Sequence, residues 1–169
     1  MKRVLILTIA SAALFLNSCK KDDDSDLQPK GNYGVITSSS TVTLNNWTSD
    51  YDDGTEYNYS SSVSWPAITQ NIVDKGIVMV YEYDGVSSWY ALPYSDGGSG
   101  WSDALNFAVS AGGVYFLNNG YDDTGSPGAS SMNGTVVRIV AVDNAGKVAN
   151  PDLDWTNYNE VCKRFGLTK

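Results

Sequence analysis

From residue 32 onward, short apolar runs alternate with clusters of Gly, Asp, Asn and Ser, a pattern typical of strands joined by turns. In residues 56–65, Tyr57, Tyr59, Ser61, Val63 and Trp65 alternate with Glu, Asn and Ser residues, which predicts a strand with one face in water. The runs at 77–81 and 136–142 are almost continuously apolar and predict central strands covered on both faces. In all we expect eight strands, at residues 34–37, 41–47, 56–65, 77–84, 88–94, 104–110, 114–118 and 135–142.

Two segments have helical features instead. Residues 69–76 begin with Thr69, a residue that can cap a helix, and end with Gly76, which can terminate one. Residues 155–165 place apolar side chains at helical spacing, and Gly166 follows as a stop. The apolar stripe of this second helix consists of Tyr158, Val161, Cys162 and Phe165.

The turn signals suggest how the strands are connected. Asp84-Gly85, Gly112-Gly113 and residues 144–146 contain Gly or Asn, which accept a positive φ at little cost and favour antiparallel neighbours. We therefore predict an all-β domain, mainly an antiparallel β-sandwich, with a short helical turn and one C-terminal helix. A chain of this length fits one such domain, which we place at residues 32–169.

The first eighteen residues have the order of a secretion signal. Lys2 and Arg3 precede an apolar run from Val4 to Leu16, and a small residue, Ser18, ends the segment. The run has thirteen residues, whereas a helix needs about 20 to cross a bilayer, so a removable signal is the better interpretation. We expect residues 1–18 to be cleaved.

Residues 16–19, Leu-Asn-Ser-Cys, resemble a bacterial lipobox, with Cys19 as the acylated first residue of the mature chain. Each buried CH₂ of an acyl chain contributes about 0.8 kcal/mol, so lipid on Cys19 holds a domain at a membrane. Residues 19–31 are rich in charge and poor in apolar side chains, which predicts a flexible acidic tether. We expect an outer-membrane lipoprotein. A lysine followed by acidic residues also resembles a surface-export signal, so periplasmic and cell-surface orientations both stay open.

Charge and composition exclude several functions. Removing residues 1–18 takes away two cations and no acid, which lowers the formal net charge from −8 to −10. Such a field repels phosphates, so we expect no nucleic-acid partner. The chain has no histidine, which excludes His-based catalytic triads and most catalytic zinc sites. Cys162 has no intramolecular partner once Cys19 is acylated, and we expect it to be a core residue.

From about residue 63 to residue 167 the chain resembles a group of small Bacteroidota lipoproteins of unknown function. The segments that carry the resemblance are residues 66–78, 89–93 and 137–140, together with Tyr158, Val161 and residues 165–167. These are packing and turn residues rather than reactive ones. The resemblance therefore implies a β-rich envelope module and supplies no catalytic residues.

Four acidic residues form a candidate calcium site. Asp50, Asp52, Asp53 and Glu56 lie close together in the sequence and could offer several of the six to eight oxygen ligands that Ca²⁺ takes. Their spacing is not that of an EF-hand loop, and Asp53-Gly54 is also a turn signal. An ordinary acidic turn is the alternative, and we predict no other cofactor.

Aromatic residues form a candidate ligand site. Trp89, Tyr90 and Trp101 could present rings to a sugar, with neighbouring Asp and Asn side chains bonding its hydroxyls. Burial of Trp65, Trp89 and Trp101 would instead indicate a structural role. The acids Glu82 and Asp84 could in principle serve a hydrolase, but Asp84-Gly85 is more simply a turn, and we predict no catalytic residues.

Together these patterns predict a lipid-anchored binding or structural module of the cell envelope, which is not an enzyme. The alternative is a surface carbohydrate-binding lipoprotein of a glycan-uptake system. The partners we expect are the membrane, through Cys19, and a glycan or protein ligand. The oligomeric state is left open.

Overall fold

The computed structural model describes residues 36–167. The chain divides into two units, residues 1–30 and 31–169, and the described residues belong to the second unit. The predicted signal segment, Cys19 and the tether at residues 19–31 lie outside the described residues. Among the helices described, none is long and apolar enough to cross a membrane.

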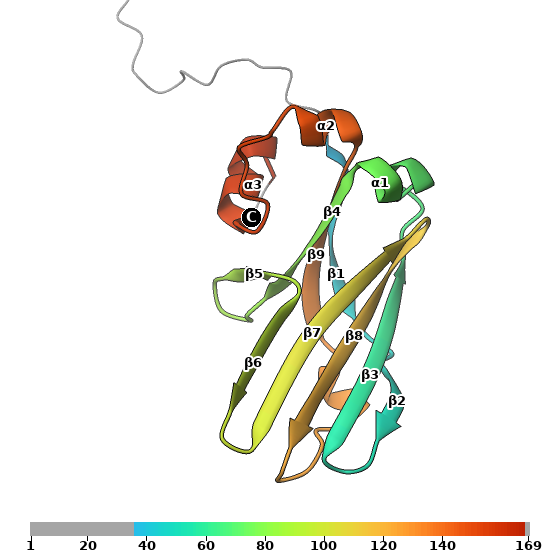
Figure 1. The fold of residues 1–169 in the computed structure, drawn as a ribbon, viewed down its shortest axis with the longest axis vertical. Helices are drawn as coiled ribbons and strands as arrows, with labels where there is room; N and C mark the ends of the chain where they lie inside the picture. Colours follow the sequence, from blue (N-terminus) through green and yellow to red (C-terminus); the bar gives the residue numbers. More distant parts are fainter. Residues whose placement is uncertain (1–35, 168–169) are drawn as a thin grey trace, which may run out of the picture. The chain divides into compact units, whose positions relative to one another are not determined.

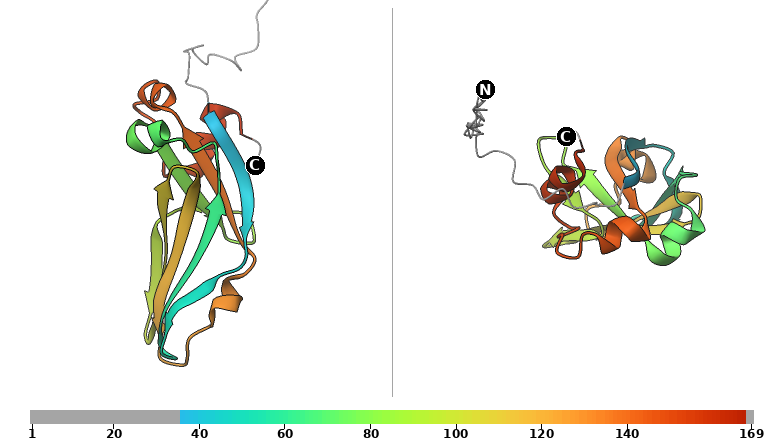
Figure 2. Two further views of the ribbon diagram at one scale, coloured as in Figure 1. Left: turned by 90° about the vertical axis from the view of Figure 1, so that its right-hand side faces the viewer. Right: turned by 90° about the horizontal axis from the view of Figure 1, so that it is seen from above.

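The described residues form two antiparallel sheets, and this confirms the predicted β-sandwich with a C-terminal helix. Sheet A has the order β1 (Ile36–Leu44), β9 (Thr135–Val142), β4 (Ile77–Tyr83) and β5 (Trp89–Ala91). Sheet B has the order β2 (Thr48–Asp52), β3 (Glu56–Ser64), β8 (Gly113–Asp122), β7 (Trp101–Ser110) and β6 (Tyr94–Gly98). In Figure 1, sheet B lies in front of sheet A, and Figure 2 shows the two layers from the side.

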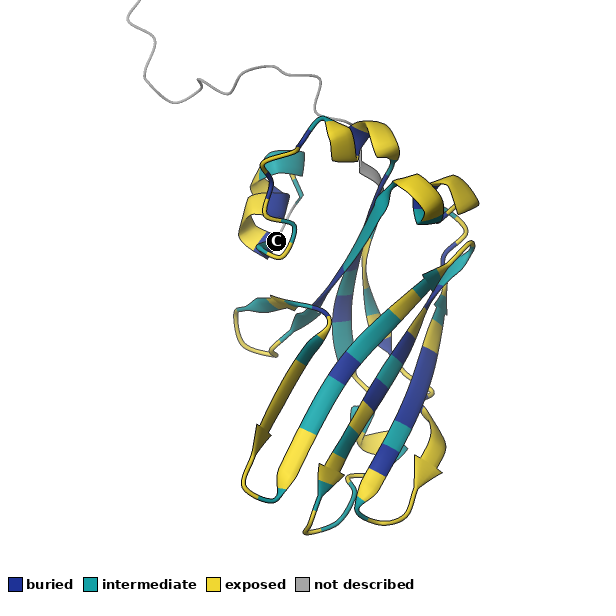
Figure 3. Cartoon of the chain, viewed as in Figure 1, coloured by how far each residue is buried: buried dark blue, intermediate teal, exposed yellow. Residues whose placement is uncertain are grey.

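The main core lies between the sheets because each sheet turns its apolar positions inward. On β3 and β8, buried and more exposed residues alternate (Figure 3), which confirms the predicted alternation of residues 56–65 except at Ser60, which is buried although it lies on the face predicted to be wet. The largest side chains that are fully buried in this layer are Tyr59, Phe116, Leu44, Ile68, Leu105 and Ile139.

Strands β4 and β9 are central and covered on both faces, as their continuous apolar sequences predict. Their outer face packs against α3 (Tyr158–Phe165), whose Val161 is fully buried. Cys162 is buried in the same cluster, which confirms its prediction as a core residue. Gly166 ends α3 in the left-handed conformation, at φ 64°, a conformation that glycine adopts without strain.

Two short helices and a 3₁₀ turn complete the fold. The helix α1 (Gln70–Lys75) has Thr69 as its N-cap and Gly76 as its C-cap, as predicted. The helix α2 (Asn144–Val148) occupies a segment that we predicted as a turn, so that prediction is wrong. The Asp143 carboxylate accepts the Gly146 N–H at 2.8 Å and so starts a helix there. A 3₁₀ turn, Ala129–Met132, precedes β9.

The chain passes from one sheet to the other at both edges, and the predicted strand boundaries are wrong at these crossings. Strand β5 of sheet A and β6 of sheet B are separated only by Leu92 and Pro93, so the single strand predicted at 88–94 is two. The strands predicted at 34–37 and 41–47 form one strand, β1, and β2 follows it in the other sheet.

Arg138, which interrupts the apolar sequence of β9, points to the outer face of sheet A. Its guanidinium donates to the Tyr158 hydroxyl at 2.7 Å and to Thr41 Oγ1 at 3.0 Å. The same group lies over the rings of Trp89 and Tyr158, 5.6 and 5.8 Å from their centroids. These contacts hold the cation at the junction of α3 and the sheet.

Candidate functional site

The outer face of sheet B differs from the other sheet surfaces because none of the helices within residues 36–167 packs on it. Helix α3 covers the outer face of sheet A, and the inner faces of both sheets form the main core. The outward positions of β3, β7 and β8 are polar or tyrosine with few exceptions, as expected for a face in water. This face spans five strands and is open to a ligand.

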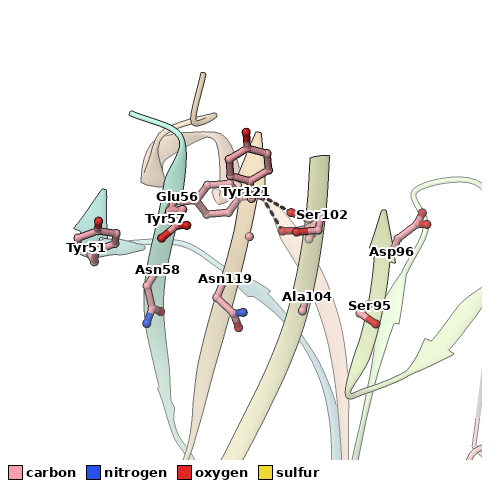
Figure 4. A pocket seen from close by; sticks show the side chains of 12 residues that line it. Tyr51, Glu56, Tyr57, Asn58, Ser95, Asp96, Ser102, Ala104, Asn119 and Tyr121 are labelled. Atoms are coloured by element: carbon pink, nitrogen blue, oxygen red, sulfur yellow. Dashed lines mark hydrogen bonds between the residues drawn. The ribbon is translucent and has the colours of Figure 1, made fainter. Parts of the chain in front are cut away.

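One row of side chains crosses this face from edge to edge. Tyr51 on β2 pairs with Asn58 on β3, and Asn58 pairs with Asn119 on β8. Asn119 pairs with Ala104 on β7, which pairs with Ser95 on β6. Neighbouring strands are about 4.8 Å apart, so the row is about 19 Å long. Figure 4 shows Asn58, Asn119, Ala104 and Ser95 side by side, with Tyr51 at one end.

This row forms the floor of a groove of about 550 Å³. A second row, in which Glu56 pairs with Tyr121 and Tyr121 pairs with Ser102, borders the groove on one side. Tyr51 and Tyr121 are 51% and 40% exposed, so both rings are accessible from solvent. The groove therefore combines a floor of short side chains with aromatic rings at its border.

Hydrogen bonds fix several of the side chains around the groove. The Tyr51 hydroxyl donates to Asp53 Oδ2 at 2.9 Å, and this bond raises the pKa of Tyr51. Asn106 Nδ2 donates to Asn119 Oδ1 at 3.1 Å, which orients the Asn119 amide. A site that is held in place before a ligand arrives loses less conformational entropy on binding.

The groove floor also contains an unsatisfied acceptor. Asn58 Oδ1 is buried and accepts no hydrogen bond from the described residues. A buried polar atom without a partner costs free energy, so such atoms in folded proteins require an explanation.

The inner side of sheet B supports the groove from below. The Tyr57 ring crosses Gly120 inside the sandwich, and its hydroxyl donates to Asp103 Oδ1 at 3.0 Å. Asn118, which is fully buried, donates to the same oxygen at 2.7 Å. Burial, followed by the charge of Asp103, raises the pKa of Tyr57, so its phenol keeps its proton. These bonds connect β3, β8 and β7 beneath the groove.

The groove is neutral to acidic. None of the five strands of sheet B contains Lys or Arg. Glu56 and Asp96 line the groove, and Asp50 lies nearby, where it accepts a hydrogen bond from the Tyr115 hydroxyl at 3.4 Å. An anionic ligand would therefore meet like charge without a compensating cation from these strands.

The four residues of the candidate calcium site are near one another in the chain but do not converge. The Asp53 carboxylate accepts bonds from the Thr55 and Glu56 N–H groups and from the hydroxyls of Thr55 and Tyr51. The Asp52 carboxylate accepts bonds from Tyr59, Ser126 and Gly54. Within residues 36–167, no three acidic, His or Cys side chains gather as a metal site would require. The calcium hypothesis therefore gains no support from this geometry.

The aromatic residues of the candidate ligand site do not come together either. Trp89 and Tyr90 are successive residues of β5 and point to opposite faces of sheet A. Trp89 stacks on Tyr158, with 5.0 Å between the ring centroids, whereas Tyr90 lines a pocket at the sheet edge. Trp101 is 42% exposed at the start of β7, and Trp65 is buried in the core. These tryptophans do not form one exposed platform.

The pocket at the sheet edge has a volume of about 560 Å³ and contains the two acids considered for catalysis. Burial raises the pKa of Glu82, although a bond with Tyr94 opposes this shift. Asp84 Oδ1 accepts the N–H groups of Val86, Ser87 and Ser88, and these bonds lower its pKa. Asp84 thus closes the turn between β4 and β5.

The fold and groove define this protein as a β-sandwich module with an open, polar, tyrosine-bordered sheet face. No protein-family model, no curated protein and no solved structure matches the chain.

Proposed function

We propose that the protein is a lipid-anchored binding module of the cell envelope, and that its ligand lies in the groove on the outer face of sheet B. The observation that carries this proposal is the row from Tyr51 to Ser95, which crosses all five strands. The exposed tyrosine rings along this face support the proposal, because they offer a ligand apolar surface, and the bond to Asp53 holds the Tyr51 ring.

The lipobox-like residues 16–19 support the anchor. Lipid on Cys19 would keep the module at a bilayer, and the acidic residues that follow would separate it from the headgroups. Binding is then the task of the domain alone. We propose no catalytic step, because Asp52 and Asp53 beside the groove, and Asp103 beneath it, already accept hydrogen bonds from backbone N–H groups, hydroxyls and an amide.

Cross-linking from the groove tests the binding proposal without knowledge of the ligand. Ser95→Cys places a thiol at one end of the row, on an exposed residue, while the native Cys162 is buried. The purified lipoprotein would be labelled with a photoreactive maleimide, mixed with the envelope fraction and irradiated. We expect covalent adducts from this variant.

The control for that experiment is Glu160→Cys, an exposed position on α3 that lies outside the groove. We expect few adducts from it. Equal labelling from the two positions, or no adducts from Ser95→Cys, would refute the groove as the binding surface.

The anchor has its own test. Cys19→Ala removes the only proposed acylation site, so we expect the protein to move from the membrane fraction to the soluble fraction. Membrane retention equal to that of the wild type would contradict lipid anchoring.

A further inference from the structure

We infer that the ligand of this groove is a neutral glycan, bound as a chain of sugar rings that runs across the five strands. This inference rests on the proposed function, since it names the ligand class of the same surface. Four features of the groove support it: its hydrogen-bonding groups, its aromatic rings, its charge and its shape.

The hydrogen-bonding groups suit hydroxyls. Carboxamides and serine hydroxyls both donate and accept, and a sugar hydroxyl also does both. The groove offers Asn58 and Asn119 on its floor, Ser95 at one end and Ser102 at its border. Asn58 Oδ1 is buried and has no donor among the described residues, so the Asn58 amide would have to turn before a ligand hydroxyl could reach this oxygen.

The aromatic rings suit the apolar C–H faces of sugar rings. Tyrosine presents a flat apolar surface with a polar tip. Tyr51 stands at the β2 end of the row and Tyr121 at its border, so a chain along the row would pass both rings. The bond from Tyr51 to Asp53 limits the positions that the Tyr51 ring can adopt.

The charge of the groove favours a neutral ligand over an anionic one. Sheet B contributes no Lys or Arg, while Glu56 and Asp96 line the groove. Polyuronates, sulfated glycans and nucleic acids all need cations for tight binding. A neutral glycan has no such requirement.

The shape and polarity of the groove favour a chain over a small molecule or a protein. The row ends at β2 and β6, which are the two edge strands, so a chain could continue beyond the sheet on either side. Protein interfaces have an apolar core, whereas the floor contains only one apolar side chain, Ala104, between Asn119 and Ser95. An extended polar polymer fits both features.

The experiment is affinity electrophoresis of the complete lipoprotein in detergent through gels that contain one polysaccharide each. The neutral probes are xyloglucan, mixed-linkage β-glucan, galactomannan and amylopectin, and the anionic probes are polygalacturonate and alginate. We expect at least one neutral polysaccharide to retard the protein, and neither anionic probe to do so. Retardation by the anionic probes alone would overturn the inference.

Point variants test whether the retardation comes from binding in the groove. Tyr51→Ala and Asn119→Ala each remove one contact, and we expect each to weaken binding about tenfold. Val148→Ala is the control, because Val148 is an exposed apolar residue of α2, 67% exposed, that lines neither the groove nor the pocket at the sheet edge. It should bind like the wild type. An unchanged affinity in both groove variants, with thermal unfolding as in the wild type, would place the glycan elsewhere and overturn the inference.

Cross-linking and affinity electrophoresis together distinguish a failure of the glycan inference from a failure of the proposed binding function. Adducts from Ser95→Cys without retardation by any neutral polysaccharide would leave the groove as a binding surface and reject the glycan. Failure of both experiments would reject the groove itself.

Discussion

Three aspartates close turns in the same way. Asp53, Asp122 and Asp154 each accept, through Oδ1, the N–H and the hydroxyl of a threonine two residues later. Such bonds favour the charged carboxylate, and the pKa of all three groups is lowered. The acidic loops of the domain thus gain order from their own backbone and hydroxyl donors.

Stability should therefore fall in acid through Asp53. Hydrogen bonds from Thr55 and Glu56, with smaller contributions from the hydroxyls of Tyr51 and Thr55, lower the pKa of Asp53 from 3.8 to about 2. A lowered folded-state pKa contributes stability that is complete above pH 3.8 and disappears as the pH falls through about 2. The melting temperature of Asp53→Asn should lie below that of the wild type at pH 6, and the difference should shrink as the pH falls towards 2 and vanish below it.

Asp152→Asn, which changes an exposed aspartate outside these turns, controls for the change in net charge. A difference between Asp53→Asn and the wild type that is independent of pH would contradict this role of the carboxylate.

A methyl group added at Gly120 should destabilise sheet B. A Cβ at this position would collide with the Ser102 carbonyl oxygen and the Tyr57 hydroxyl. Overpacking of this kind costs about 1–3 kcal/mol, so Gly120→Ala should lower the free energy of unfolding by that amount. Chemical denaturation measures the change, with Ser64→Ala at an exposed position of β3 as the control. A Gly120→Ala variant as stable as the wild type would show that Tyr57 need not cross this residue.

At the level of elements, the sequence predicted the strands that have a regular apolar pattern. It missed a strand that forms because a neighbouring strand pairs with it. The strands predicted at 77–84 and 135–142 are observed as β4 and β9 almost without change, because continuous apolar runs mark central strands. Strand β2 was missed because its residues, TSDYD, are all exposed and include two aspartates that depress strand propensity. It forms because β3 supplies the pairing partner.

The candidate site was harder to predict because it depends on register. The wet face of residues 56–65 was visible in the sequence, and it contributes Asn58 and Glu56 to the groove. The pairing of Asn58 with Asn119 joins residues that are far apart in the chain, and the pairing of Ala104 with Ser95 depends on the register of the β6–β7 hairpin. The sequence predicted the candidate ligand site at Trp89, Tyr90 and Trp101, whereas the exposed rings of the groove belong to Tyr51 and Tyr121.

The C-terminal helix α3 should be required for a stable sheet A. Val161 is fully buried against Val140 and Val142 in the cluster beneath the helix. Val161→Ala removes buried methyl groups and should destabilise the domain by about 1–3 kcal/mol, measured by chemical denaturation. Lys163→Ala, at an exposed position of the same helix, should have little effect. Because Ala has the highest helix propensity, a loss in Val161→Ala must come from packing, and a Val161→Ala variant as stable as Lys163→Ala would contradict the packing role.

At the level of the whole molecule, the proposed lipid anchor would place the domain in the envelope, and its orientation there would decide which ligands can reach the groove. A polymer too large for the outer membrane could reach the groove only if the domain were displayed outward, and the lysine and acidic residues after Cys19 resemble an export signal for such display. We therefore expect a protease added to intact cells to remove the full-length protein rapidly. The tether at residues 19–31, which has the composition of an unfolded segment, should be the first site of cleavage.

A periplasmic lipoprotein serves as the internal control, because it should stay intact unless the cells are lysed. Cleavage of the wild type at residues 19–31 with an intact control would establish outward display, and binding of fluorescent xyloglucan to whole cells should then require Tyr51. Full protection until lysis would instead place the groove in the periplasm, where only oligosaccharides small enough to cross the outer membrane could bind. The length of glycan that binds in cells, compared with the length that binds to the purified protein, would therefore report the side of the membrane on which the groove lies.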